Sequence, residues 1–432
     1  MAAQNNNTNV MESHETIASK APKKLVPKLR FKEFEVEWKK IAIQQLTPSN
    51  EKYGIVDGPF GSNLKTIHYR NEGIPIITSG YVTDGYFKAD EYLFVTQEKF
   101  NKEKRSAVNP GDIVMAKIGA RCGSSAILPL YHERGILSGN ALKITVDESR
   151  FSRNLIWQIL YKLYKTKKLE LLKTVGAQPA ISIANLKKFK ISVPTLPEQQ
   201  KIAGFLSSVD AKLQQLTQKK ELLEQYKKGV MQQLFNQQLR FKQDDGSDYP
   251  DWEYPHANVL FKSISDKNHN GDLPILAISQ EFGAIPRDLI NYKISVEEKS
   301  VDGYKVIQKG DFIISLRSFQ GGIEYSNYKG ICSPAYNILR PTSDDVVHGF
   351  YKRYLKTEYY IKQLQRKLEG IRDGKMISYK YFSEIKLPFP SKQEQQKIAN
   401  YLSAIDSKIE TVTQQIEATQ QFKKGLLQQM FV

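Results

Sequence analysis

The sequence is poor in residues on which several classes of protein depend. Its 432 residues contain two cysteines, Cys122 and Cys332, which excludes a disulfide framework and indicates a reducing compartment, the cytoplasm. We expect both to be small buried residues. The six histidines are scattered without metal-ligand spacing, so no metal site is expected. No apolar run approaches the ~18 residues of a membrane span. Residues 1–24 lack the apolar core of a secretory signal and predict a flexible tail.

Motifs for catalysis are also missing. No Asn-Pro-Pro-aromatic signature of amino-methyl transfer occurs, and residues 109–112 are typical of a turn into a strand. Gly370 to Lys375 resembles a phosphate-binding loop, but its glycine spacing is one residue short and Met376 stands where Ser or Thr would hold magnesium. Residues 384–386 have the carboxylate-x-lysine form of some nucleases without the upstream Pro-Asp. The sequence therefore predicts a chain without catalytic activity of its own.

Acidic residues are too few to balance the basic ones. Lys and Arg number 63 against 46 Asp and Glu, which gives a formal charge of +17. Such an excess favours a polyanionic partner, usually nucleic acid; the alternative is a basic but inert surface. The length suggests two or more domains, and hydrophobic and aromatic contents of 40% and 11% support packed domains rather than disorder.

One segment occurs twice in the chain. The sequence EQQKIA begins at Glu198 and again at Glu394, and the likeness continues over the residues that follow, always 196 positions apart. A hydroxyl residue stands three positions before each glutamate, at Thr195 and Ser391. This is the pattern of a capping box, in which the hydroxyl and the glutamate satisfy free amides of the first helical turn. Both copies are therefore predicted to be helices.

Apolar residues recur at alternating spacings of four and three in both copies. The predicted pairing positions are Ile202, Leu206, Val209, Leu213, Leu216, Ile398, Leu402, Ile405, Ile409 and Val412. This spacing favours a coiled-coil seam over two core helices inside one globule, because Gln and Lys are dense on the other faces. Since both copies lie in one chain, they can pair antiparallel with pseudo-twofold symmetry. Lys220, Lys227 and Lys423 interrupt the seam, and the sequence leaves open whether they face DNA or a partner subunit.

The duplication extends beyond the helices. The segment LRFK starts at Leu29 and at Leu239 and leads to Trp38 and Trp252, respectively. Five segments follow from this: a tail over 1–24, a globular domain over 25–195, a long helix over 196–236, a second globular domain over 237–390 and a second long helix over 391–432. The fold class is α+β, with two similar mixed α/β domains separated by the two helices.

Short β-branched runs and apolar periodicity predict the elements of both domains. Strands are expected at 74–78, 112–116, 125–128, 142–146 and 189–193, and at 273–276, 310–314 and 386–390. Helices are expected at about 153–173 and 348–368, with a short helix capped by Ser182 and reaching Leu186.

These motifs carry a family resemblance. Asp57-Gly58-Pro59-Phe60-Gly61-Ser62, the strand start at Gly111-Asp112, the run from Gly176 to Ser182, and Pro194 to Ile202 with its long helix resemble specificity (S) subunits of type I restriction-modification systems. The resemblance covers nearly the whole chain. The second half departs from it, because it has Gly370 to Met376 in place of Gly-x-Gln-Pro and lacks a Gly-Pro-Phe-Gly element near residue 265.

The resemblance implies that each globular domain is a target-recognition domain that reads one half of a bipartite double-stranded DNA site. It also implies that the helices pack antiparallel as a spacer and dock two modification subunits, which carry S-adenosylmethionine and methylate adenine. Restriction motor-nuclease subunits, which use ATP and Mg, join that core. No cofactor is implied for this chain.

Candidate DNA contacts follow from chemistry, because polar side chains on glycine-rich loops suit base edges and Lys or Arg suits phosphates. They are Lys65, Ser79, Lys117, Arg121, Gln178, Ser182, Gln280, Arg317, Gln320, Arg372, Lys375, Ser378 and Tyr379. Ser182 and Ser378 have the alternative role of helix caps. For the whole chain, the alternative to a DNA-reading subunit is a coiled-coil interaction scaffold whose basic surface is incidental.

Overall fold

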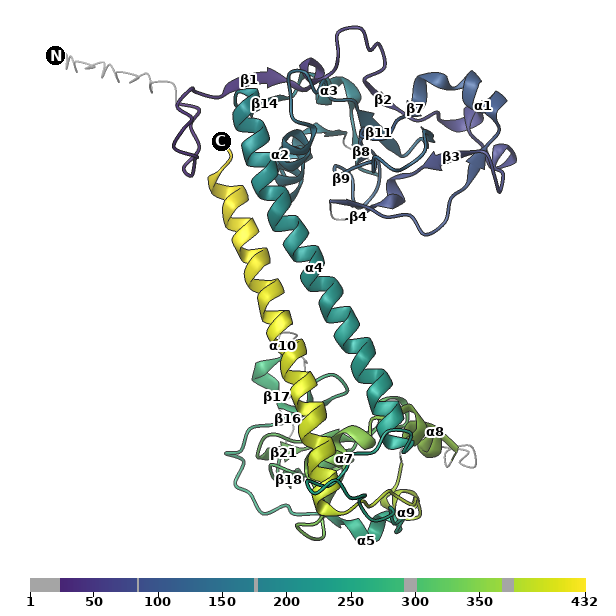
Figure 1. The fold of residues 1–432 in the computed structure, drawn as a ribbon, viewed down its shortest axis with the longest axis vertical. Helices are drawn as coiled ribbons and strands as arrows, with labels where there is room; N and C mark the ends of the chain where they lie inside the picture. The colour runs from purple at the N-terminus through teal and green to yellow at the C-terminus, as the bar shows by residue number, and fades with distance from the viewer. Residues whose placement is uncertain (1–23, 84, 175–177, 291–300, 367–376) are drawn as a thin grey trace, which may run out of the picture. The chain divides into compact units, whose positions relative to one another are not determined.

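The computed structural model describes residues 24–83, 85–174, 178–290, 301–366 and 377–432 (Figure 1). The predicted tail therefore lies outside the described residues except for Lys24. The chain forms two compact units. Unit 1 comprises the residues up to Gln214 together with Glu417–Val432, and unit 2 comprises Gln215–Ile416. Each unit joins a mixed α/β domain to a part of both long helices.

Unit 1 is built on two four-stranded sheets. One has the order β2-β11-β8-β9 and is antiparallel throughout; the other has the order β6-β3-β10-β7, with β3 and β10 parallel. The strands are β2 (Ile55–Asp57), β3 (Ile74–Ile77), β6 (Phe94–Val95), β7 (Ala107–Val108), β8 (Ile113–Ala116), β9 (Ser125–Ile127), β10 (Gly135–Leu137) and β11 (Ala141–Ile144). Two-stranded pairs complete the unit: β1 (Lys39–Ala42) with β14 (Lys190–Val193), β4 (Val82–Thr83) with β5 (Tyr86–Phe87), and β12 (Lys173–Thr174) with β13 (Ala180–Ile181).

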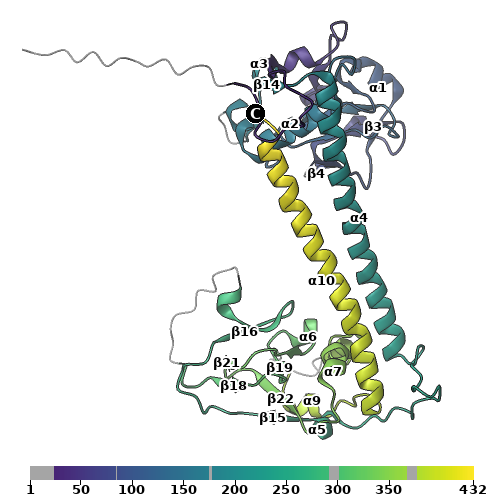
Figure 2. The same cartoon turned by 60° about the vertical axis from the view of Figure 1, so that its left-hand side comes forward.

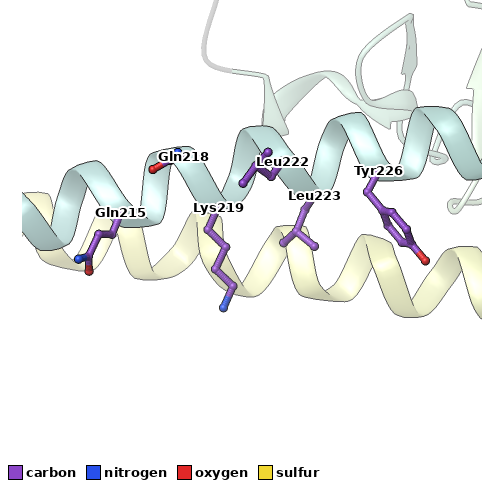
Figure 3. A pocket seen from close by; sticks show the side chains of 6 residues that line it. All are labelled: Gln215, Gln218, Lys219, Leu222, Leu223 and Tyr226. Carbon is purple, nitrogen blue, oxygen red and sulfur yellow. The ribbon is translucent and has the colours of Figure 1, made fainter.

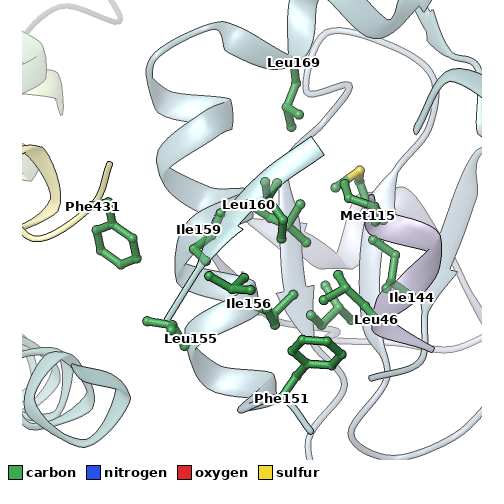
Figure 4. Close-up of a cluster of buried hydrophobic side chains, with 14 of the residues drawn as sticks. Leu46, Met115, Ile144, Phe151, Leu155, Ile156, Ile159, Leu160, Leu169 and Phe431 are labelled. Atoms are coloured by element: carbon green, nitrogen blue, oxygen red, sulfur yellow. The ribbon is translucent and has the colours of Figure 1, made fainter. Parts of the chain in front are cut away.

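The core of unit 1 lies between these sheets and its helices. The helices are α1 (Gln97–Lys102), α2 (Arg153–Lys165), α3 (Ile183–Lys188) and the N-terminal part of α4 (Leu196–Phe235). Leu155 and Leu160 of α2 are fully buried in a cluster that also contains Met115 of β8 and Phe431 (Figure 4). The last residues of the chain thus pack into the same core as the first domain.

Unit 2 repeats this plan, with fewer strands among the residues that the structure describes. Its four-stranded sheet has the order β15-β22-β19-β20, and two antiparallel two-stranded pairs, β16-β17 and β18-β21, accompany it. The strands are β15 (Phe261–Ile264), β16 (Leu276–Ser279), β17 (Gly283–Pro286), β18 (Lys305–Ile307), β19 (Phe312–Ile314), β20 (Glu324–Tyr325), β21 (Gly330–Cys332) and β22 (Asn337–Pro341). The helices are α5 (Ala257–Leu260), α6 (Ser318–Gly321), α7 (His348–Tyr354), α8 (Glu358–Arg366), α9 (Tyr379–Ser383) and most of α10 (Lys392–Gln429).

In both units, an aspartate before an inner strand of the sheet accepts hydrogen bonds from a basic residue of the neighbouring strand. Asp112, which precedes β8, accepts from Lys143 Nζ at 3.3 Å and from Thr145 Oγ1 at 2.6 Å. Asp311, which precedes β19, accepts from Arg340 Nε and Nη2 at 2.7 and 2.8 Å. The Gly-Asp strand start that the two halves share is therefore a buried anchor between neighbouring strands.

Both long helices form where the sequence predicts them, and they pack antiparallel within each unit (Figures 1 and 2). In unit 1, Ile202 and Leu206 of α4 share a core with Leu427 and Met430 from the end of α10. In unit 2, the C-terminal part of α4 contributes Val230 and Leu234, which share a core with Ile398, Leu402 and Ile405 near the start of α10. Of the ten predicted pairing positions, nine are buried and Ile409 is half-buried.

The segment before each tryptophan, here called the strap (Leu25–Trp38 in unit 1, Leu239–Trp252 in unit 2), is tied to a helix end. The amide of Leu29 donates to the carbonyl of Gln429 at 3.0 Å, and the amide of Leu239 donates to the carbonyl of Gln233 at 3.1 Å. These residues are repeat equivalents. In unit 2 the strap continues directly from the helix it meets, whereas in unit 1 it meets the far end of the chain.

Two predicted helices were too long. The helix expected over 153–173 ends at Lys165, because Lys167 adopts the left-handed conformation at φ 58°, which terminates a helix; a separate 3-10 helix, η6 (Lys168–Leu172), follows. The helix expected over 348–368 is two helices, because the hydroxyl of Thr357 caps the amide of Tyr360 and starts α8.

Two predicted strands of unit 2 were also inaccurate. The strand expected over 273–276 begins only at Leu276, and Ile275 forms a single parallel bridge with Ile331. The run 386–390 forms isolated bridges, Lys386 with His256 and Phe389 with Glu253, in place of a continuous strand. Prolines 388 and 390 lack the amide hydrogens that a continuous ladder needs.

Candidate nucleic-acid interface

A buried glutamate at the start of each long helix fastens the strap to it. Glu198 is fully buried and accepts from Arg30 Nε at 2.8 Å, Arg30 Nη2 at 2.7 Å and Trp38 Nε1 at 3.2 Å. In unit 2, Glu394 accepts from Arg240 at 3.1 and 2.9 Å and from Trp252 Nε1 at 3.0 Å. The charge-assisted, bidentate geometry compensates the cost of burying the carboxylate.

This contact corrects the predicted capping boxes. The side chains of Glu198 and Glu394 turn to the straps, and only the hydroxyl half of the second box forms, with Ser391 Oγ accepting from the amide of Glu394 at 3.3 Å. The sequence carried a signal for the true role, because Arg and Trp of the strap are duplicated together with the glutamate. A local capping rule is outweighed here by a partner more than a hundred residues away.

The glutamine beside each glutamate fastens the globular domain. Gln199 accepts from the amide of Ser152 at 2.8 Å and donates to the carbonyl of Pro194 at 2.9 Å. Gln395 repeats both contacts with Val347 at 2.9 Å and Pro390 at 2.8 Å. The repeated Glu-Gln pair is thus a mounting point that presents each domain on its helices in the same way. Sequence reasoning missed this role as well.

Two lysines that interrupt the apolar seam form ion pairs between the repeats. Lys423 Nζ lies 2.6 Å from Asp210 Oδ1 in unit 1, and Lys227 Nζ lies 2.6 Å from Asp406 Oδ1 in unit 2. The two pairs are repeat equivalents. Burial alone would raise the pKa of Asp406, but Lys227 and Arg353, whose Nη2 lies 2.6 Å from it, outweigh burial and lower that pKa. The ammonium groups of Lys227 and Lys423 are therefore paired within the protein rather than free to contact DNA.

Several candidate DNA contacts of unit 1 come together at the end of β2 and β8. The Lys117 amide donates to the carbonyl of Asn140 at 2.8 Å, and the Ser79 amide donates to Asn140 Oδ1 at 3.2 Å. The carbonyl of Lys117 accepts from Ile181, which places the segment that carries the exposed Gln178 nearby.

Other candidates of unit 1 lie apart from this group or serve the fold. Arg121 is exposed and donates to Thr83 Oγ1 at 3.3 Å, and Lys65 is exposed in the loop before η3 (Thr66–His68). Ser182 caps α3 through the amide of Asn185 at 3.3 Å. Its hydroxyl is therefore occupied within the chain.

The candidate DNA contacts of unit 2 also include both exposed residues and residues whose side chains are used by the fold. Gln280 Nε2 donates to the backbone carbonyl of Arg317 at 3.0 Å, and Arg317 and Gln320 are exposed on and beside α6, so these three residues lie in one group. Ser378 caps α9, and Tyr379 Oη donates to the carbonyl of Phe261 at 2.9 Å. Both hydroxyls are thus used by the fold. The candidates Arg372 and Lys375 lie outside the described residues.

A cleft of about 1010 Å³, with both polar and apolar lining residues, adjoins this group in unit 2. Gln320 lines it together with Lys228 near the end of α4 and with Lys356 and Lys362 beside and on α8. Lys356 pairs with the buried Glu324, whose pKa is raised by burial against the opposing effect of that lysine.

In unit 2, α4 carries exposed apolar side chains beside α10, where the hydroxyls of Tyr226 and Tyr401 lie 2.6 Å apart. A shallow hollow of about 520 Å³ is lined by Gln215, Gln218, Lys219, Leu222, Leu223 and Tyr226 (Figure 3). Leu222 and Tyr226 are 57% and 51% exposed. The repeat equivalent of Tyr226 is Phe422 in unit 1, and it is 53% exposed. An exposed aromatic thus stands at the same position of both helix copies.

The described ranges show neither reactive thiols nor a metal cluster. Cys122 and Cys332 are buried, as predicted; burial raises the pKa of both thiols, that of Cys332 to about 12. Among the residues that the structure describes, no group of three or more His, Cys, Asp or Glu side chains could hold a metal ion. The helices within the described ranges include none long and apolar enough to cross a membrane.

Two mixed α/β domains, each mounted on an antiparallel helix pair by the same Glu-Gln contacts and each with polar loop groups of its own, define a duplicated specificity scaffold. The chain belongs to the family described as type I restriction modification DNA specificity domain, which matches residues 36–225 and 256–420.

Related proteins agree with this assignment. The type I restriction enzyme MjaVIII specificity subunit of Methanocaldococcus jannaschii is 28% identical over 378 residues, which cover 82% of this chain and 84% of that protein. The type I restriction enzyme HindI specificity subunit of Haemophilus influenzae is 24% identical over 192 residues, 42% of this chain and 41% of that one. The crystal structure of the S subunit of a type I restriction-modification system from M. genitalium shares the fold, with a TM-score of 0.56, 17% identity and coverage of 94% of this chain and 99% of that one.

Proposed function

We propose that the chain is the DNA sequence-recognition subunit of a type I restriction-modification complex, in which each unit reads one half of a bipartite site. The observation that carries the proposal is the contrast between the two units. Their mounts repeat contact for contact, from Glu198 and Glu394 to Asp210 and Asp406, whereas their loops present different polar groups. A common mount with different loops is what two readers of unlike half-sites require, because base specificity comes from the loop side chains.

The chain contributes recognition and no catalysis of its own. S-adenosylmethionine is expected on two modification subunits that methylate adenine, and ATP and Mg on the motor-nuclease subunits. The formal charge of +17 supports contact with the phosphate backbone, which supplies affinity without specificity.

The exposed aromatics at the repeated helix position support a docking role. Tyr226 and Phe422 are equivalent and half-exposed, and Leu222 extends the first patch. Aromatic residues are enriched at the centres of protein interfaces. Because the exposed aromatic occurs once per helix copy, it suits two copies of one partner, and we assign this position to the two modification subunits.

A reconstituted methylation reaction tests the recognition role. The chain mixed with its modification subunit should methylate adenines within one split site, while the chain alone should methylate nothing. Binding to duplex DNA should weaken by roughly 10³ or more over a fourfold rise in salt if six or more phosphates are contacted. A salt-independent, non-specific complex would instead favour the interaction scaffold.

The docking assignment has its own experiment. Tyr226→Ala and Phe422→Ala should each reduce the number of modification subunits bound from two to one, and the double variant should bind none stably. Size-exclusion chromatography with light scattering gives this stoichiometry. Tyr53→Ala, which removes an aromatic that is 39% exposed on the globular part of unit 1, is the control and should leave two subunits bound. Full assembly of the double variant would place the partners elsewhere.

A further inference from the structure

Phe60 is an exposed aromatic residue in the loop that follows β2. Its side chain is 47% exposed. A single exposed apolar side chain is ordinary on a protein surface and by itself carries no meaning. The loop around Phe60, however, is built to hold that ring in one place.

Three glycines allow this loop to pack closely against the turn at Ser138–Gly139. A Cβ on Gly58 would lie 2.2 Å from the carbonyl oxygen of Ser138, so only glycine fits there. A Cβ on Gly139 would lie 3.0 Å from the Phe60 ring itself, and Gly61 adopts φ +57°, a conformation that favours glycine. The loop is therefore pressed against the turn at Ser138–Gly139, and the ring has a defined position.

A charged group lies over the face of the ring. Lys117 Nζ lies 4.3 Å from the centroid of the Phe60 ring and 2.5 Å from Asp57 Oδ2. Arg105 Nη2 approaches the other oxygen of Asp57 at 3.5 Å. Asp57 thus orients the ammonium over the ring, and two cations against one carboxylate leave the surroundings positive. Lys117, which we expected to contact DNA directly, is better suited to position Phe60.

We propose that Phe60 makes an apolar contact with the bases of the half-site read by unit 1, an inference that rests on the proposed function. An exposed, immobilised ring in a positive setting suits duplex DNA, because phosphates are attracted to the cations while the ring meets a thymine methyl group or a base step. The base-reading candidate Ser79 is tied to the same turn through Asn140. The second half of the chain lacks a Gly-Pro-Phe-Gly element near residue 265. The contact of an aromatic ring with the bases is therefore expected in the half-site read by unit 1 only.

The chain offers a matched control on the same strand. Tyr53 precedes β2 and Phe60 follows it, so the two rings mark opposite ends of that strand. Tyr53 is 39% exposed and Lys52 Nζ lies 5.5 Å from its ring centroid, so it is also an exposed aromatic beside a lysine. Tyr53 differs from Phe60 in its place in the domain, in its phenol hydroxyl and in the longer distance to its lysine.

The experiment uses the complex of the chain with its modification subunit. Sequencing of methylated adenines in cells that carry the wild-type complex first defines the bipartite site. A fluorescent duplex with that site and a random duplex then serve as probes. Phe60→Ala should weaken binding to the cognate duplex about tenfold, or ~1.4 kcal/mol, and binding to the random duplex less than twofold. Tyr53→Ala should change neither. Methylation in cells carrying Phe60→Ala should become degenerate in one half-site and stay strict in the other.

Several results would overturn the inference. These are unchanged cognate affinity in Phe60→Ala, an equal loss on both duplexes, or degeneracy in both half-sites. If Phe60→Ala fails to fold by circular dichroism, Phe60→Leu decides, since it keeps apolar bulk without the ring. It should weaken cognate binding about threefold, and wild-type affinity would refute the proposal. Absence of site-specific methylation by the wild-type complex would instead refute the proposed function itself.

Discussion

Replacing Glu198 with alanine is expected to destabilise unit 1 by about 3–5 kcal/mol, the usual cost of removing one partner from a buried ion pair. The carboxylate is fully buried, and the Arg30 side chain that it holds is only 11% exposed. After the substitution, that guanidinium would keep its contact with the carbonyl of Val36 at 2.5 Å but would lose both carboxylate bonds. Trp38 Nε1 would lose its acceptor as well.

The equivalent substitution in unit 2, Glu394→Ala, should cost less. Arg240 is 23% exposed and keeps further acceptors, with the carbonyl of Pro250 at 2.8 Å and Asp251 at 3.7 Å. Water and these groups compensate part of the lost charge pairing. The two variants thus form an internal comparison, in which the same residue in the same motif has different solvent access.

Urea unfolding followed by tryptophan fluorescence and hydrogen exchange can measure both costs. The chain has two units and is not expected to unfold in one step. The fluorescence of Trp38 and Trp157 reports on unit 1 and that of Trp252 on unit 2. Faster hydrogen exchange at the strap amides would show that the loss of stability lies at the strap. Glu72→Gln, an exposed position in unit 1, should change nothing. A cost below about 1 kcal/mol for Glu198→Ala, or a larger cost for Glu394→Ala, would refute the reasoning.

Three further predictions concern the helices. Asp210→Lys should destabilise unit 1 by on the order of 3 kcal/mol in urea unfolding, and adding Lys423→Asp should restore more than half of that loss, because the pair is nearly buried. The lowered pKa of Asp406 means that its ionised form stabilises unit 2 above about pH 4 and that this contribution is lost as the pH falls; Asp406→Asn should therefore flatten stability between pH 5 and 3. Inserting four residues near both Leu216 and Val412 adds about 6 Å of helix and should lengthen the DNA gap by about two base pairs, as methylated-site sequencing would show.

Each of these has an outcome that contradicts it. If the double charge reversal is no more stable than Asp210→Lys alone, the two side chains do not interact. If Asp406→Asn keeps the wild-type acid sensitivity, other carboxylates cause it. If the insertions change the half-sites rather than the gap, the helices belong to the reading surface and are not a spacer.

The helices could be predicted because their signal is repeated and periodic. The expected limits of 196–236 and 391–432 compare with Leu196–Phe235 and Lys392–Gln429 in the structure. A strand such as β8 was also predictable, since a buried β-branched run between a glycine and a turn leaves few alternatives.

The side-chain partners could not be predicted, because they lie far away in the sequence. The capping-box pattern predicts that Glu198 binds the amides of its own helix end, whereas its partner Arg30 is 168 residues away. Lys117 stays a predicted DNA contact, but its ion-pair partner Asp57, 60 residues earlier in the chain, could not be read from the sequence. Loop positions acquire their roles only once the fold has brought such partners together.

The strap contacts have a consequence for the order in which the chain folds. In unit 2, the strap residue Leu239 and its partner Gln233 are only six residues apart, so their hydrogen bond can form as soon as both have been synthesised. In unit 1, Leu29 can form the equivalent bond only after Gln429 has been synthesised. At synthesis rates of about 5–20 residues per second, that wait lasts about 20–80 s. During this time the site that Phe431 later fills beside Leu155 is open and apolar, so the domain that is translated first is the one completed last.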